Sequence, residues 1–321
     1  SMKGDFSRNT FDSTKHYNMV LLQMGRLLLD SDWVEQQQIY QHRIETEALD
    51  VIGKCGAPKH DPGFGIEAIN GDFTISAGRF YVDGILCINE ADVAYSQQPD
   101  LPNPPDLGSL FAEADTTNGI IYLDVWKHHI LPIDDPQIRE VALGGPSTAT
   151  RLKTLWQVKV LPITEPVNQL SCEGDLSEWD DLIAPNTGTL NARTAAAEAT
   201  DNPCLIPPGA GYLRLENQLY RVEIHGGGSA DTATFKWSRD NGSVVTAISR
   251  IDGQEVTVAD LGPDDVLGFA KGQWVEVIDD ALELNGQPGE LLQIDDFTND
   301  AAGRPVIVLA SAPTPLAAEF P

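Results

Sequence analysis

The sequence predicts a mainly β fold with one long helix near the N-terminus. Short runs in which apolar and polar residues alternate recur along most of the chain, as they do in half-buried strands. One stretch, residues 33–52, is instead rich in Glu, Gln, Ile and Ala, a composition typical of a helix. The expected architecture is therefore a set of antiparallel β-sandwich or small-barrel modules that follow an N-terminal helix.

The helix is predicted to begin at about Trp33 and to stop near Gly53. Asp32 and Glu35 stand three residues apart, which is the spacing of a capping box, in which each side chain satisfies a free backbone N–H of the first turn. Gly53 suits the residue with positive φ that ends many helices.

Two short apolar runs precede the helix: the strand-like run 19–22 and the run 27–29. They have little local core of their own, so they must be buried on the following domain or on another subunit. Each such side chain contributes about 1.5–3 kcal/mol when it is buried. We expect at least part of this set to dock a partner, and the expected docking residues are Val20, Leu22, Leu27, Leu29 and Trp33.

Along the helix, one face is formed by Gln37, Gln41, Ile44, Ala48 and Val51, which alternate by four and three. Two interpretations follow from this spacing. In the first, an amphipathic helix packs on its own β domain. In the second, this face joins helices of neighbouring subunits in a homo-oligomer.

The first β unit is predicted from strands at 72–76, 79–82 and 85–88, with a hairpin turn at Asp83–Gly84. Residues 97–118 are expected to form a long loop, and further strands are expected at 119–126 and 155–161. The segment 162–208 is predicted to be mostly irregular, with a short helix at 192–199.

The last third of the chain is predicted to be β-rich, with strands at 219–224, 274–278, 290–294 and 306–309. Residues 232–248 are predicted to form a hairpin around Asn241–Gly242, which would pair Trp237 with Thr246 and Phe235 with Ile248. The chain then divides into a docking segment with the helix (1–55), a first β domain (56–164), an irregular connection (165–211) and a second β domain (212–321).

The composition narrows the classes of partner. The 321 residues include 48 acids against 21 Lys and Arg, a net charge of -27. Such a surface repels nucleic-acid phosphates and anionic lipid. No apolar run approaches the ~20 residues that span a bilayer, and no signal peptide is recognisable. We expect a protein made in the cytoplasm. The Pro-rich residues 312–321 are typical of a linker, so we expect further chain beyond them.

Cysteines, acids and histidines give no signature of an active site or a metal site. No two cysteines have CxxC spacing, so a zinc site is not expected. We expect the cysteines to be free thiols. If any pair forms a disulfide, we expect it to be Cys172 with Cys204. Five Asp-Asp pairs could supply the two carboxylates of a glycosidase, but such pairs are usually solvated turns. His128 and His129 would point to opposite faces of a strand. No catalytic, cofactor-binding or metal-ligating residues are therefore expected.

The first fifty residues, from Lys3 to Gly53, resemble the N-terminal segment of a family of phage-tail-like proteins of unassigned biochemistry, found with contractile tails and contractile injection systems. Further blocks resemble that family at 122–126, 138–146, 148–151, 216–225, 233–239 and 274–277. The resemblance implies a non-enzymatic structural or adaptor component of such a particle, associated with its baseplate, fibre or spike. Its partners would be other particle subunits, and the particle could be released from the cell. The alternatives are a carbohydrate-binding β module, which would bind a surface glycan through exposed aromatic residues, and a polysaccharide-active enzyme.

Overall fold

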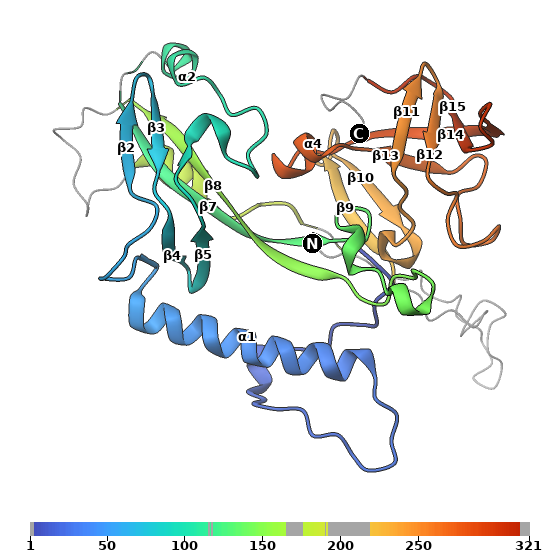
Figure 1. The fold of residues 1–321 in the computed structure, drawn as a ribbon, viewed down its shortest axis with the longest axis horizontal. Helices are drawn as coiled ribbons and strands as arrows, with labels where there is room; N and C mark the ends of the chain where they lie inside the picture. The colour runs from blue at the N-terminus through green and yellow to red at the C-terminus, as the bar shows by residue number, and fades with distance from the viewer. Residues whose placement is uncertain are drawn as a thin grey trace, which may run out of the picture.

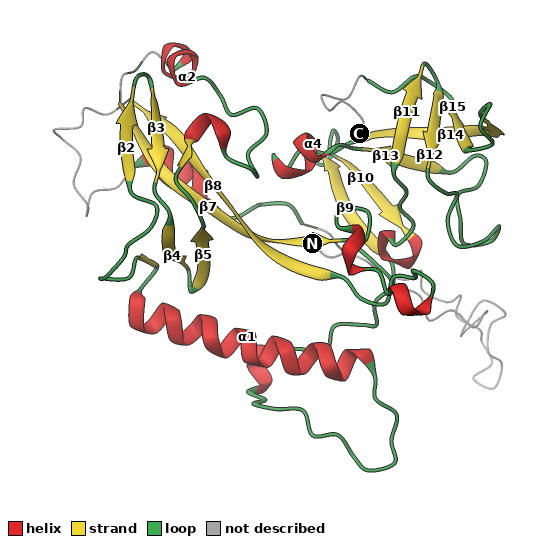
Figure 2. Cartoon of the chain, viewed as in Figure 1, coloured by secondary structure: helices red, strands yellow, loops and turns green. Residues whose placement is uncertain are grey.

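The computed structural model describes residues 3–114, 116, 118–164, 176–189, 191 and 219–314. Two β-rich parts are joined by a long two-stranded ribbon, and helix α1, Asp30–Ile52, lies along the outside of the molecule (Figure 1). Strands in antiparallel sheets make up most of the regular structure (Figure 2). The predicted fold class, mainly β with one long N-terminal helix, is confirmed.

The first β part holds two small antiparallel sheets. The strand orders are β1-β4-β5 and β2-β3-β6. The turn predicted at Asp83–Gly84 joins β4 to β5, and the positive φ angles of 46° and 80° at these two residues are those of a tight hairpin turn. The bounds are β1 Cys55–Gly56, β2 Ile66–Ile69, β3 Asp72–Ile75, β4 Gly78–Val82, β5 Ile85–Asn89 and β6 Val93–Ala94.

The ribbon is formed by β7, Asn118–Ile130, and β8, Arg151–Ile163, paired without a register shift. Thirteen residues at ~3.4 Å each give it a length of roughly 44 Å. One end of the ribbon belongs to the core of the first part, whose buried side chains are Phe73, Ile75, Cys87, Tyr95, Leu101, Trp156 and Val158. Gln157 is also buried, and its Nε2 donates to the backbone oxygens of Asp100, at 2.5 Å, and Leu284, at 3.1 Å. This side chain ties the ribbon to the second β part.

The second β part contains a five-stranded antiparallel sheet in the order β11-β12-β15-β14-β13. Its bounds are β11 Ile248–Asp252, β12 Glu255–Val258, β13 Trp274–Val277, β14 Glu290–Asn299 and β15 Pro305–Leu309. The sheet encloses a second core of Val256, Val258, Val277, Leu292, Ile294, Ile307 and Leu309. The last three predicted strands are therefore confirmed, whereas β11 and β12 were not predicted as a pair.

The predicted hairpin around Asn241–Gly242 is wrong. Strand β10, Thr234–Ser238, pairs instead with β9, Arg221–Gly226, in a register that sets Phe235 opposite Ile224 and Trp237 opposite Val222. Left-handed angles begin one residue early, at Asp240, and the chain makes a 3-10 turn, η6, Arg239–Gly242. The turn is held by another segment, because Asn241 Nδ2 donates to the backbone oxygen of Gly4 at 3.0 Å and Gly4 N donates to that of Asn241 at 3.1 Å.

Two further expectations need correction. Residues 97–118 do not form one loop: Asp106 caps helix α2, Leu107–Glu113, by accepting the Ser109 N–H at 2.8 Å. The run 19–22 is not a strand, since none of the segments that the structure describes pairs with it in a sheet. The helix predicted at 192–199 lies outside the described residues. The remaining short elements are η1 Ser13–Lys15, η2 Tyr95–Gln97, η3 Pro136–Ile138, η4 Val141–Leu143, α3 Ser177–Ile183 and α4 Asp280–Leu284.

Candidate docking surface

Helix α1 begins three residues earlier than predicted and without the predicted capping box. The residue before its first turn is Leu29, which makes no side-chain cap. Asp32 lies inside the helix, and Glu35 instead accepts a hydrogen bond from Thr10 Oγ1 at 2.5 Å. The other end is as predicted, because the chain leaves the helix at Gly53 with a φ of 92°.

The side of α1 that faces the rest of the chain is largely polar. The contacts that hold it include the following: Asp30 Oδ1 with Ser7 Oγ at 2.7 Å, Glu35 with Thr10, Gln36 Oε1 with Val20 N at 2.7 Å, the His42 ring with Phe11 at 5.7 Å between centroids, and Glu45 Oε1 with Lys127 Nζ at 2.5 Å. Within α1 only Ile39 is fully buried. The helix is therefore attached to its own chain mainly by hydrogen bonds and one ion pair.

The opposite side of α1 is apolar and exposed. Trp33, Tyr40, Ile44 and Val51 have exposed fractions of 62%, 48%, 65% and 79%. We call these four residues the apolar stripe. An amphipathic helix of a globular protein buries its apolar side and exposes its polar side, and α1 does the reverse. The interpretation in which the face containing Ile44 and Val51 packs on its own β domain is therefore wrong.

The loop before α1 adds to this exposed apolar surface. Residues 17–29, which we call the exposed loop, extend away from the β parts (Figure 1). Met24 is fully exposed, and the other large apolar side chains of the loop that are at least half exposed are Tyr17, Met19, Leu21, Leu22, Leu27, Leu28 and Leu29. Of the five predicted docking residues, Leu22, Leu27, Leu29 and Trp33 are exposed and Val20 is partly buried. The structure thus leaves four of these five residues exposed on their own chain.

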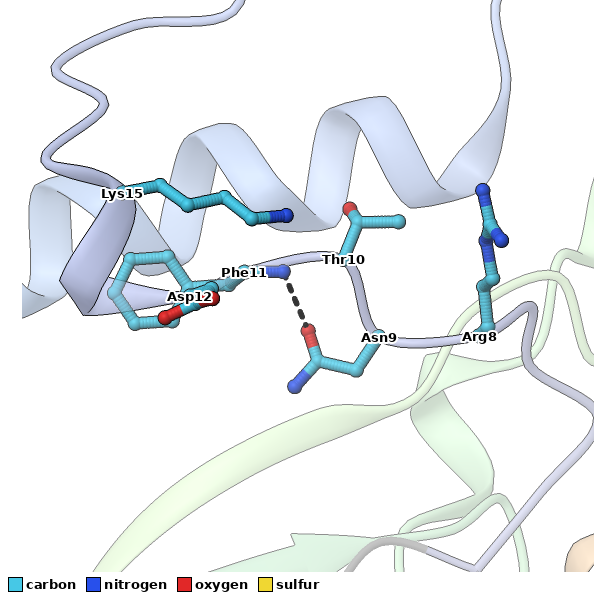
Figure 3. Close-up of a pocket in the computed structure, with 6 residues that line it drawn as sticks. All are labelled: Arg8, Asn9, Thr10, Phe11, Asp12 and Lys15. Carbon is cyan, nitrogen blue, oxygen red and sulfur yellow. Dashed lines mark hydrogen bonds between the residues drawn. The ribbon is translucent and has the colours of Figure 1, made fainter.

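A polar hollow lies on the segment that precedes the exposed loop. It has a volume of about 360 Å³ and is lined by Arg8, Asn9, Thr10, Phe11, Asp12 and Lys15. In Figure 3 these side chains come from one stretch of backbone that runs beside the helix, and Asn9 Oδ1 accepts the Phe11 N–H. Asp12 accepts hydrogen bonds from the hydroxyl and the N–H of Thr14, which lower its pKa. These bonds shape the local backbone and do not assemble a reactive group.

The paired aspartates serve mainly as local hydrogen-bond acceptors. Asp134, Asp135 and Asp279 each accept a nearby backbone N–H at the start of a turn or helix. Asp264 accepts the N–H groups of Leu267 and Val266, which lower its pKa. A glycosidase acid needs a raised pKa, so Asp264 has the opposite character. Sequence reasoning had left a catalytic use of these pairs open, and their local geometry gives it no support.

The histidines and cysteines that the structure describes form no metal-ligand group. On β7, His129 Nε2 lies 2.7 Å from Thr150 Oγ1 and its ring packs edge-on against Phe6, and burial lowers its pKa. In the described part of the chain, no three His, Cys, Asp or Glu side chains are grouped as metal ligands. Cys55 is free and exposed, and Cys87 is free and buried, which raises its pKa to about 11. Cys172 and Cys204 lie outside the described residues.

A second exposed apolar face lies on the β9–β10 pair. Phe235 and Trp237 are exposed on the same side of β10, opposite Ile224 and Val222. The ring of Tyr220 lies 6.2 Å from that of Trp237. Sequence reasoning missed this face because it assigned Phe235 and Trp237 to a buried sheet with the wrong partner strand.

The model of one protein family, described as a family of unknown function (DUF6519), matches residues 2–175 and 182–317. No curated protein matches the chain. No solved structure matches it either.

Proposed function

We propose that this chain, which belongs to the family of unknown function DUF6519, is a non-enzymatic structural or adaptor subunit of a phage-tail-like contractile particle. The observation that carries the proposal is the N-terminal segment. Its exposed loop and apolar stripe are presented to solvent, while the polar side of α1 faces the chain itself. A surface of this kind is suited to burial against another subunit. The resemblance of the first fifty residues to tail-particle proteins supports the proposal that this other subunit belongs to a phage-tail-like particle.

The test is incorporation into particles. A variant that replaces Leu21, Leu22, Leu27 and Leu28 by Ser keeps the polar contacts of α1 and removes most of the apolar area of the exposed loop. We expect its amount in purified tail-like particles to fall at least ~10-fold relative to the wild type, since each lost burial is worth ~1.5–3 kcal/mol. Quantitative mass spectrometry of sedimented particles measures this ratio.

The matched control replaces Val141 and Leu143 by Ser. Both are exposed apolar residues, at 85% and 69%, on η4 and outside the proposed surface. The control variant should be incorporated like the wild type. Normal incorporation of the loop variant, or equal loss for both variants, would contradict the docking role.

The alternative function, carbohydrate binding, has one specific observation in its favour. Tyr220, Phe235 and Trp237 present exposed rings on the β9–β10 pair, and sugar rings stack on such side chains. Titration calorimetry with a panel of bacterial surface polysaccharides tests this reading. Binding that disappears in Trp237→Ala and persists in the loop variant would favour it, and no heat of binding would count against it.

None of the helices in the described ranges is long and apolar enough to cross a membrane. We propose that the protein is made in the cytoplasm and reaches its site of action as part of the particle.

A further inference from the structure

Residues 3–11, which we call the strap, run from the second β part to helix α1 (Figure 1). At one end the buried residues Gly4 and Asn241 exchange two hydrogen bonds. Gly4 N donates to the backbone oxygen of Asn241 at 3.1 Å, and Asn241 Nδ2 donates to that of Gly4 at 3.0 Å. Further along, Ser7 donates its N–H and its hydroxyl to the carboxylate of Asp30 at 3.1 and 2.7 Å. The strap therefore joins η6 to the first turn of α1.

Between these two attachments the strap crosses the ribbon at His129 of β7. The ring of Phe6 packs edge-on against the imidazole, with 5.6 Å between the ring centroids. On β8's side of the ring, His129 Nε2 lies 2.7 Å from the hydroxyl of Thr150. Both Phe6 and His129 are partly buried. The strap thus covers a side chain that can change its charge near neutral pH, and the water around that side chain depends on whether the strap is in place.

The surroundings of His129 favour the neutral imidazole. Burial lowers its pKa below the ordinary value of 6.5. The charges of His128, the N-terminal amine and Arg221 on β9 lower this pKa as well, and Asp134, in the turn after β7, is the one nearby charge that raises it. A proton on His129 would therefore be held against an aromatic ring in mostly positive surroundings, which is unfavourable unless the ring regains contact with water.

We propose that the strap is a pH-sensitive latch, which closes over neutral His129 and opens when the imidazole takes up a proton. In the open state the ring is in water and titrates at its ordinary pKa of 6.5, so just below this pH the closed state binds fewer protons than the open state. Closure is therefore fully favoured above pH 6.5 and weakens as the pH falls below it. One proton changes such an equilibrium by at most ~10-fold per pH unit.

Opening of the latch is a local change. It releases the first turn of α1 from η6, whereas the ion pair of Glu45 with Lys127 still holds the middle of the helix on β7. Local openings of this kind occur without unfolding of the cores. The inference goes beyond the proposed function, because it concerns the isolated chain and needs neither a particle nor a partner.

The first test is hydrogen exchange of the strap peptide, measured by mass spectrometry on the isolated chain at pH 7.5 and 5.5. After correction for the intrinsic exchange rate, the wild type should exchange at least ~3-fold faster at pH 5.5. His129→Gln cannot take up the proton but can still form a hydrogen bond with Thr150, so its corrected rate should be equal at both pH values. His42→Gln, at a second histidine whose ring contacts the strap through Phe11, should keep the wild-type response.

The second test is an NMR titration of the histidine rings, which does not depend on the folding of the His129 variant. In the wild type the His129 ring should titrate below pH 6.5. In Phe6→Ser, which removes the ring that covers the imidazole, the midpoint should move back toward 6.5 and the strap should exchange rapidly at both pH values.

Three results would overturn the latch. The first is an equal or slower corrected exchange rate of the wild-type strap at pH 5.5, as expected if the charged imidazole were instead attracted to the Phe6 ring. The second is a pH response that persists in His129→Gln. The third is a wild-type His129 ring that titrates at or above pH 6.5.

Discussion

Gly84 is the residue at which the β4–β5 turn meets helix α1. Its φ is 80°, and a Cβ atom at this position would lie 2.2 Å from the backbone oxygen of Glu45. Any side chain here must push the helix away from the first β part. Glu45 is also the residue whose carboxylate pairs with Lys127 on β7, so one turn of α1 is held from two directions.

We therefore predict that Gly84→Ala lowers the free energy of unfolding by more than the cost of placing alanine at a positive φ, because the added Cβ also meets the backbone of Glu45. Gly71→Ala is the matched control, because Gly71 has a φ of 85° and nothing within 4 Å of the added carbon. The control should lose about 1–2 kcal/mol, and Gly84→Ala should lose at least ~1 kcal/mol more. Urea unfolding measures both, and equal losses would show that the turn does not press on the helix.

At the scale of elements, a cluster of partly buried charges joins the β9–β10 pair to the five-stranded sheet. Lys236 on β10 lies 2.5 Å from Glu276 on β13 and 4.0 Å from Glu223 on β9, which also pairs with Arg221. Burial alone would raise the pKa values of the two glutamates. The pKa of Glu223 is lowered because the hydrogen bond and charge of Arg221, together with the charge of Lys236, outweigh burial. The pKa of Glu276 is lowered because the hydrogen bond and charge of Lys236 outweigh burial.

A lowered folded-state pKa means that these carboxylates stabilise the fold when ionised. Their contribution is complete above the ordinary value of 4.5 and is lost as the pH falls through the folded-state values. We predict that the free energy of unfolding declines below pH 4.5 and that Glu276→Gln makes this decline shallower. Asp252→Asn, at a mostly exposed pair with Arg250, should leave the slope unchanged. Chemical unfolding at a series of acidic pH values tests this, and identical slopes for wild type and Glu276→Gln would contradict it.

The elements show where sequence reasoning succeeds and where it stops. The Asp83–Gly84 turn was predicted because the two strands that it joins are adjacent in sequence and the turn chemistry decides their pairing. Asn241–Gly242 has the same chemistry, but β10 pairs with the earlier strand β9, and Asn241 is held by Gly4 at the far end of the chain. Two residues that are so far apart in the sequence leave no local sequence pattern from which their contact could be predicted. The early start of α1 was missed because Leu29 provides no cap to be recognised.

At the scale of the whole molecule, the central feature is the orientation of α1 and the exposed loop. The sequence identified Leu22, Leu27, Leu29 and Trp33 as residues that need burial, since apolar runs without a local core are visible in one dimension. It could not tell whether their own β domain would cover them. That depends on the polar contacts of Asp30, Glu35, Gln36 and Glu45, which turn the other side of the helix inward.

The exposed loop contains a direct reporter of its own burial. Met24 is fully exposed in the chain, and methionine sulfur oxidises at a rate set by its access to solvent. The decisive measurement compares the oxidation rate of Met24 by dilute peroxide in the isolated chain and in purified particles, using mass spectrometry, with Val141→Met as an exposed reference site. Docking through the N-terminal segment predicts at least a ~10-fold slower rate for Met24 in particles and an unchanged rate at position 141. Equal rates for Met24 in both states would contradict the account.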